Sequence, residues 1–161
     1  MARIQIVHHI SDIRTDRLDD CWAAATAMAM RRHSIAGTEH VKALAKAANI
    51  PLDQGTLPDS SVPLLGRAVN LGVHDFQVRE ITLQALELMM RRGPVVAFGH
   101  LNYPNNRQTK HVVAIYSLVG DGSARGTTLK LNDPYSVANP FSDDWEHFSE
   151  SVADITWALS Y

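Results

Sequence analysis

Residues 19–33 read DDCWAAATAMAMRRH, and this stretch predicts a helix that is buried on several sides. Alanine and methionine are strong helix formers, and Asp19 and Asp20 can cap the free amides of a first turn, so the helix is expected from about Cys21 to His33. Its many alanines make the helix thin, which suits close packing against several neighbours. Cys21 is therefore expected in the first turn of a central helix.

Three more helices are expected before residue 95. Each begins at a capping hydroxyl and ends at a Gly, Pro or Asn, and each carries apolar residues at helical spacing. They cover about residues 38–49, 60–71 and 83–92. Short strands are expected at 3–10 and 74–78, where the residues are alternating or β-branched.

From residue 95 onward the pattern is that of a sheet. Apolar or alternating runs separated by turn-rich segments predict strands at 95–98, 111–119, 127–131 and 155–159. Helices come first and most of the sheet follows. This order predicts one α+β domain over residues 1–161, in which an N-terminal helical half packs on a C-terminal antiparallel sheet.

Composition narrows the classes of protein. The chain has 161 residues, of which 45% are hydrophobic and 20% charged, as expected for one globular domain. A net charge of -2 argues against nucleic acid or an anionic membrane surface as partner. No apolar run is as long as a membrane span, and the N-terminus lacks the apolar core of a secretory signal. We expect a cytoplasmic domain, or one exported by another route.

The single cysteine, Cys21, excludes an internal disulfide and a multi-cysteine zinc site. No pair of ligand residues at short range supports a metal site of another kind, so neither a metal nor another cofactor is predicted. A lone cysteine is either a small buried apolar residue or a working thiol. A position at the start of a helix favours a working thiol, because the free amides there, including that of Cys21, lower the thiol pKa and can donate to an oxyanion. Asp19 and Asp20 would oppose this effect, so they are expected to face the helix amides or solvent.

His111 is the expected base among eight histidines. It opens the strand HVVAIY directly after a polar loop, where the sheet can hold an imidazole rigidly beside a cleft. Asp133 follows the next strand, which should run antiparallel, so its carboxylate can accept from the second imidazole nitrogen. Asn132 is the alternative, since alternation lets only one of the two face His111. The other histidines are expected in surface or packing roles: His8, His9, His33, His40, His74, His100 and His147.

Four motifs together resemble the papain-like cysteine proteases, within them the compact bacterial branch that includes effector proteases and bacteriocin-leader peptidases. In the family's order, over about residues 15–136, they are Cys21-Trp22-Ala23-Ala24, Gly93-Pro94-Val95-Val96, His111-Val112-Val113-Ala114-Ile115 and Asn132-Asp133-Pro134. The resemblance implies a papain-like fold with a Cys21-His111-Asp133 triad that hydrolyses a peptide or isopeptide bond through a thioester.

The oxyanion hole departs from the family's pattern. Family members usually carry a Gln six residues before the nucleophile, where this chain has Thr15. The second donor could come from Thr15, from a backbone amide, or from Arg14 or Arg17, or be assembled only on substrate binding. Thr15, Trp22 and Asn132 are the candidate supporting residues around the triad.

Two other functions fit the same residues. The Cys-then-His order and HVVAIY also resemble the NlpC/P60 peptidoglycan amidases, although those usually have a small residue where this chain has Trp22. A papain-fold binding module without catalysis is the second alternative. The resemblance to toxin domains delivered by specialised secretion systems implies a protein substrate in a target cell's cytosol and a cognate immunity protein as partner.

Overall fold

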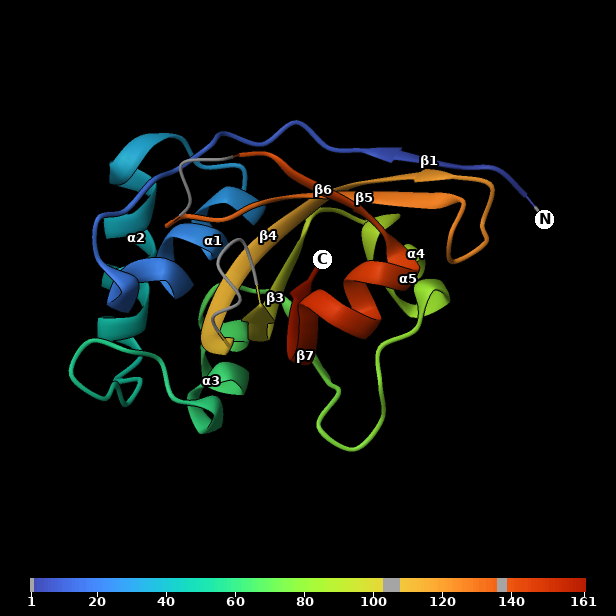
Figure 1. Ribbon diagram of the computed structural model, residues 1–161. Helices are drawn as coiled ribbons and strands as arrows, with labels where there is room; N and C mark the ends of the chain where they lie inside the picture. The colour runs from blue at the N-terminus through green and yellow to red at the C-terminus, as the bar shows by residue number, and fades with distance from the viewer. Residues whose placement is uncertain (1, 103–107, 136–138) are drawn as a thin grey trace.

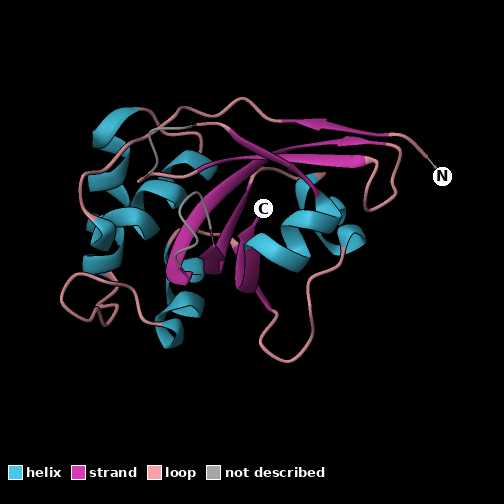
Figure 2. Cartoon of the chain, viewed as in Figure 1, coloured by secondary structure: helices cyan, strands magenta, loops and turns pink. Residues whose placement is uncertain are grey.

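The computed structural model describes residues 2–102, 108–135 and 139–161. One antiparallel sheet runs through the molecule with helices on both sides (Figures 1 and 2). On one side lie α1 (Cys21–Ala29), α2 (Ser34–Ala47) and α3 (Val62–Ala68), and on the other lie α4 (Leu83–Met90) and α5 (Trp145–His147). Within these ranges, no helix combines the length and apolar character that crossing a bilayer requires.

The sheet contains seven strands in the described residues, and every pair is antiparallel. The order is β2-β7-β3-β4-β5-β6, with β1 paired to β4. The strands are β1 (Ile4–Val7), β2 (Gly72–Asp75), β3 (Val95–Asn102), β4 (Gln108–Gly120), β5 (Thr127–Asn132), β6 (Phe141–Asp144) and β7 (Ala153–Ser160). The predicted α+β class, with helices packed on an antiparallel sheet, is confirmed.

The long strand β4 organises the sheet. Along one edge of β4, the first half pairs with β3 and the end of the second half pairs with β1. Along the other edge, the second half pairs with β5. His111 pairs with Gly99 near the start of β4, where β5 does not reach. The imidazole is therefore carried by a strand that is fixed at one edge and open at the other.

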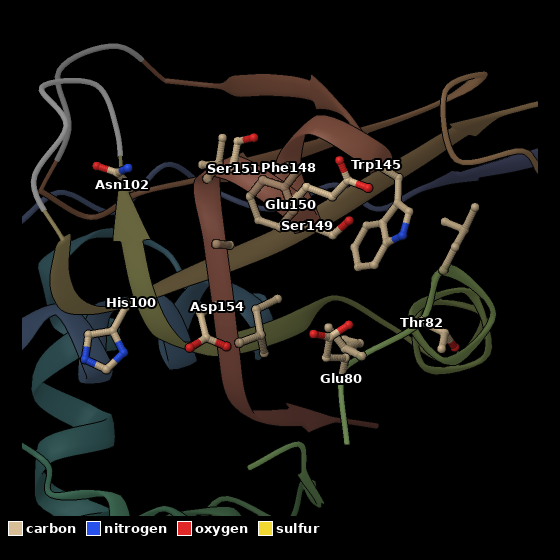
Figure 3. Close-up of a pocket in the computed structure, with 15 residues that line it drawn as sticks. Glu80, Thr82, His100, Asn102, Trp145, Phe148, Ser149, Glu150, Ser151 and Asp154 are labelled. Atoms are coloured by element: carbon tan, nitrogen blue, oxygen red, sulfur yellow. The ribbon is translucent and has the colours of Figure 1, made fainter. Parts of the chain in front are cut away.

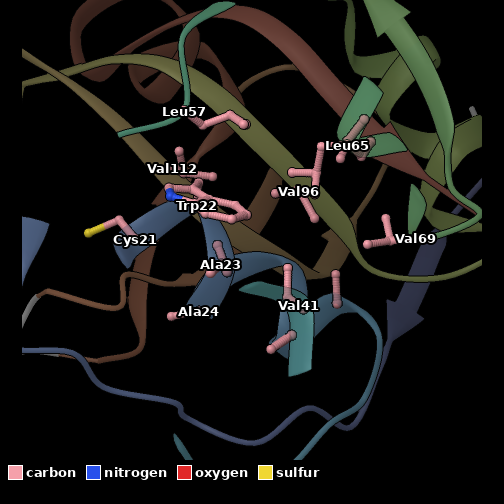
Figure 4. Close-up of a cluster of buried hydrophobic side chains, with 14 of the residues drawn as sticks. Cys21, Trp22, Ala23, Ala24, Val41, Leu57, Leu65, Val69, Val96 and Val112 are labelled. Carbon is pink, nitrogen blue, oxygen red and sulfur yellow. The ribbon is translucent and has the colours of Figure 1, made fainter. Parts of the chain in front are cut away.

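Side-chain alternation divides the core into two clusters. Even-numbered residues Val96, Phe98, Val112 and Ala114 pack with α1, α2 and α3, and we call this cluster the helical-side core (Figure 4). Odd-numbered residues Val95, Ala97, Val113 and Ile115 pack with α4 and the segment 145–152, and we call this cluster the far-side core. All nine residues of α1 are buried, as its alanine-rich sequence predicts.

Element boundaries differ from the sequence prediction in informative ways. Helix α1 ends at Ala29 instead of His33, because Arg31 takes a left-handed φ of 58°. The predicted cap at Thr82 is confirmed, since its side chain accepts from the Ala85 amide at 3.1 Å. The predicted caps at Asp19 and Asp20 are wrong: a 3-10 turn, Leu18–Asp20, precedes α1 and no side chain caps it.

Candidate active site

Cys21 is the first residue of α1 and is only 2% exposed. Its sulfur lies at the margin of the helical-side core and points away from Trp22 (Figure 4). Cys21 and His111 line the same small cavity, of about 40 Å³. One wall of this cavity comes from the helical half, including Trp22 and Leu57, and the other from the sheet, including Phe98. The fold thus brings the predicted nucleophile and base together.

His111 is held by the predicted carboxylate. Its Nε2 lies 2.6 Å from Oδ1 of Asp133, and both residues are buried, at 7% and 6% exposure. The Tyr135 amide donates to the same oxygen at 2.8 Å. An Nε2–H that donates to a carboxylate leaves Nδ1 of the neutral ring as a proton acceptor. In that tautomer Nδ1 of His111 is available to accept a proton.

Asn139 fixes the position of Asp133, and sequence reasoning missed it. Its Oδ1 accepts from the Asp133 amide at 3.1 Å, and its Nδ2 donates to the Asp133 carbonyl at 2.9 Å. The same Nδ2 also donates to Asp12 at 2.9 Å. An Asn directly before a proline reads as an ordinary turn residue, so no local signal distinguishes it.

The electrostatics of Cys21 contradict the sequence prediction. Burial, followed by the nearby carboxylates of Asp133, Asp20 and Asp19, raises the pKa of the Cys21 thiol to about 12. The expected lowering of the thiol pKa by the helix start is wrong, because burial and the nearby carboxylates both disfavour the thiolate. Asp20 pairs with Lys42 at 3.4 Å and Asp19 with Arg17 at 3.3 Å, so neither caps the helix.

The groups that were expected to donate to the oxyanion make other hydrogen bonds or ion pairs. The amide of Cys21, expected to be free, donates to the Leu18 carbonyl in the 3-10 turn. The Thr15 hydroxyl accepts from the Arg17 amide at 3.1 Å in a local turn, and Thr15 does not line the Cys21 cavity. Arg14 pairs with Asp12 at 2.9 Å. A second donor is thus not preformed by these groups.

The two remaining candidates, Trp22 and Asn132, line different cavities. Trp22 lines the Cys21 cavity, and its Nε1 donates to the Gly55 carbonyl at 3.0 Å, which ties α1 to the loop beside it. Asn132 lines a different cavity, of about 270 Å³, and does not contact His111 in the way proposed as an alternative. Successive residues at the end of β5 face opposite ways, which is why only Asp133 reaches the imidazole.

A much larger cavity lies elsewhere. About 950 Å³ in volume, it lies between the start of α4, the end of β3 and residues 145–155, with Glu80, Glu150 and Asp154 among its lining residues (Figure 3). Neither Cys21 nor His111 lines this cavity, so it is separate from the predicted active site. In the described ranges, no group of three or more His, Cys, Asp or Glu side chains could hold a metal ion.

Comparison with known proteins identifies the fold. No protein-family model and no curated protein matches the chain. Among solved structures, it is similar to the peptidase domain of Streptococcus ComA, a bifunctional ABC transporter involved in a quorum-sensing pathway. The two share 13% identity with a TM-score of 0.55, over 94% of this chain and 98% of that domain. The chain therefore has the papain-like peptidase fold.

Proposed function

We propose that this protein is a cysteine peptidase with Cys21 as nucleophile, His111 as base and Asp133 as the residue that orients His111. One observation carries the proposal: Cys21 and His111 line one cavity, while Nε2 of His111 is bonded to Asp133. A thiol, an imidazole and a carboxylate in this order match the arrangement that cysteine and serine hydrolases use.

The reaction would run through a thioester. As the Cys21 sulfur attacks the carbonyl carbon, its proton passes to Nδ1 of His111, and the Asp133 carboxylate stabilises the imidazolium. The carbon–nitrogen bond then breaks, and the leaving amine takes the proton from His111. Water, activated by His111, hydrolyses the thioester and restores the thiol. In the closed site, burial and then nearby carboxylates raise the thiol pKa to about 12, so Cys21 rests there as a neutral thiol whose proton must pass to His111.

Substrate binding must widen the site. A cavity of about 40 Å³ has room for roughly a water molecule, far less than a peptide. Movement of the turn before α1 would also break the bond from the Cys21 amide to Leu18 and release that amide as an oxyanion donor. The proposal therefore includes an oxyanion hole that is assembled only on substrate binding.

Cleavage of a proteome-derived peptide library tests the proposed activity. Wild-type protein should generate new termini, detected by mass spectrometry, whereas Cys21→Ala and His111→Ala should not. Circular dichroism and thermal melting should show that both variants remain folded. Equal cleavage by wild type and Cys21→Ala would overturn the mechanism. Release of muropeptides from purified peptidoglycan, without peptide cleavage, would favour the amidase alternative.

A non-catalytic binding module is the second candidate, and two observations favour it. The Cys21 thiol is buried with a raised pKa, and its amide is already bonded. Such a module would cleave no peptide in the library, and its Cys21 would react with iodoacetamide at a rate independent of His111. Peptide cleavage that requires both residues excludes this candidate.

For the cellular role, we propose a bacterial effector or toxin domain that cleaves a protein in a target cell's cytosol and is neutralised by a cognate immunity protein. The support is the motif resemblance to such domains together with the papain-like fold. Inducible expression in bacteria provides the test. Growth should slow with wild type and not with Cys21→Ala, and proteomics of new N-termini should name the substrate. Equal growth with both would contradict a toxin role.

A further inference from the structure

A large groove begins directly beside the candidate active site. Its volume is about 770 Å³, and it lies between α2 and the loop 49–55; we call it the α2 groove. Asp20 and Trp22, which flank Cys21 in the sequence, both line it. Trp22 also lines the Cys21 cavity, so the two spaces share this residue. A polypeptide held at Cys21 would have this groove as its neighbour.

One wall of the groove is a single stripe of α2. Glu39, Lys42, Ala43 and Lys46 line it, and their spacing of three, four and seven residues places them on one helix face. The opposite wall includes Ile50 and Leu52, and Leu52 is 43% exposed although it is a large apolar residue. The groove therefore combines an apolar wall with a charged stripe.

The charges of the groove are paired except at one end. Lys42 lies 3.4 Å from both Asp20 and Glu39, and Arg17 lies 3.3 Å from Asp19. Among the residues that the structure describes, Lys46 has no ion-pair partner. It lies about one helical turn beyond Lys42 on α2. The unpaired charge of the groove is thus positive and lies beside apolar surface.

We propose that the α2 groove binds the substrate polypeptide next to the scissile bond and selects there a side chain with an aliphatic stem and a carboxylate, glutamate above all. The stem would contact Ile50 and Leu52 while the carboxylate pairs with Lys46. Because Asp20 and Trp22 flank Cys21 and an extended chain advances about 3.3 Å per residue, we expect the selected residue within about four positions of the bond that is cut. This inference rests on the proposed peptidase function and adds its substrate class.

Peptide binding to the inactive Cys21→Ala protein tests the groove without catalysis. The probes are three fluorescein-labelled decapeptides that alternate leucine with glutamate, glutamine or lysine, measured by fluorescence anisotropy. The glutamate peptide should bind about five- to tenfold more tightly than the glutamine peptide at low salt, and 0.5 M NaCl should reduce the difference. Adding Lys46→Glu should abolish the preference, whereas Lys130→Glu, the same charge change on β5, should preserve it.

The outcomes separate the two claims. Equal binding of the three peptides, or a glutamate preference that survives Lys46→Glu, would overturn the acidic-substrate inference. Sequenced cleavage sites from the library give a second measure, since acidic residues should be enriched within about four positions for wild type and not for Lys46→Glu. Cleavage without that enrichment overturns only the groove inference. Acidic binding without cleavage of any substrate overturns only the peptidase function.

Discussion

The ammonium of Lys110 lies 2.9 Å from the carboxylate of Asp59, and this ion pair joins β4 to the 3-10 turn before α3. Lys110 lines the Cys21 cavity and is the residue directly before His111. The cavity has one wall from the helical half and one from the sheet, so the pair ties the two walls together. Because both side chains are about half exposed, the pair should add less than about 1 kcal/mol to stability.

Removing this tie should make Cys21 easier to reach. We expect Asp59→Ala to speed alkylation of Cys21 by iodoacetamide about two- to fivefold at pH 8, with little change in melting temperature. Mass spectrometry of timed samples measures the rate. Glu87→Ala, which removes an ion pair to Arg91 on α4 away from the cavity, is the matched control and should leave the rate unchanged. Equal rates in both variants would show that the pair does not restrict access.

Asp133→Ala should have opposite effects on turnover and on thiol reactivity. Loss of the carboxylate leaves His111 poorly oriented and its imidazolium unsupported, so kcat should fall about 10²- to 10⁴-fold. The same carboxylate raises the pKa of Cys21, so its removal should increase the thiolate fraction and the alkylation rate at pH 9. Unfolding would also expose the buried thiol and speed its alkylation, so an unchanged melting temperature must accompany the faster reaction. An alkylation rate that does not increase would contradict the effect of Asp133 on the thiol.

The Cys21 thiol should make stability depend on pH in the alkaline range. Its pKa is raised from 9.0 to about 12, first by burial and then by carboxylates, so the folded state favours the protonated thiol. This contribution is complete below about pH 9 and is lost as the pH rises toward 12. Relative to Cys21→Ala, wild type should lose on the order of 1 kcal/mol of unfolding free energy per pH unit above 9. Urea unfolding at pH 8 to 10.5 measures the difference, and parallel curves would contradict the raised pKa.

Asn139 is expected to act as a positioning residue for the triad. In Asn139→Ala the backbone of Asp133 loses its two hydrogen bonds to Asn139, so kcat should fall about tenfold while KM changes little. The pH at which activity rises should also shift, because the carboxylate no longer holds His111 as firmly. Asn139→Asp, which keeps one acceptor but adds a charge near Asp12, should be at least as damaging. An unchanged pH profile with a lower melting temperature would reduce Asn139 to a purely structural role.

The elements that the sequence predicted well are those specified by local pattern. Alternation identified β4 and β5, and a hydroxyl cap identified the start of α4. Because β4 and β5 pair antiparallel, Asp133 could be brought to His111 by counting along two strands. In the structure Asn132 pairs with Ala114, so the antiparallel pairing brings the end of β5 near His111, and the Asp133 side chain completes the contact.

Features that depend on distant parts of the chain were not predicted. Strand β6, of sequence FSDD, has no apolar alternation and exists because it pairs with β5. The π-helical turn Phe148–Val152 places Phe148 and Val152 in the far-side core, a tertiary role without a local signal. The raised pKa of Cys21 likewise depends on burial and on Asp133, which reaches the thiol only through the fold.

Cys21 belongs to the helical-side core, whereas the far-side core lies across the sheet. A substitution that repacks Val41, Leu65 or Val96 therefore shifts the same helix that carries the sulfur. Thermal stability and the position of the thiol cannot be changed independently in this cluster. Leu86, Leu129 and Phe148 offer the opposite situation, since their neighbours do not include the reactive group. Laboratory evolution toward heat resistance should accumulate its tolerated changes on that second side.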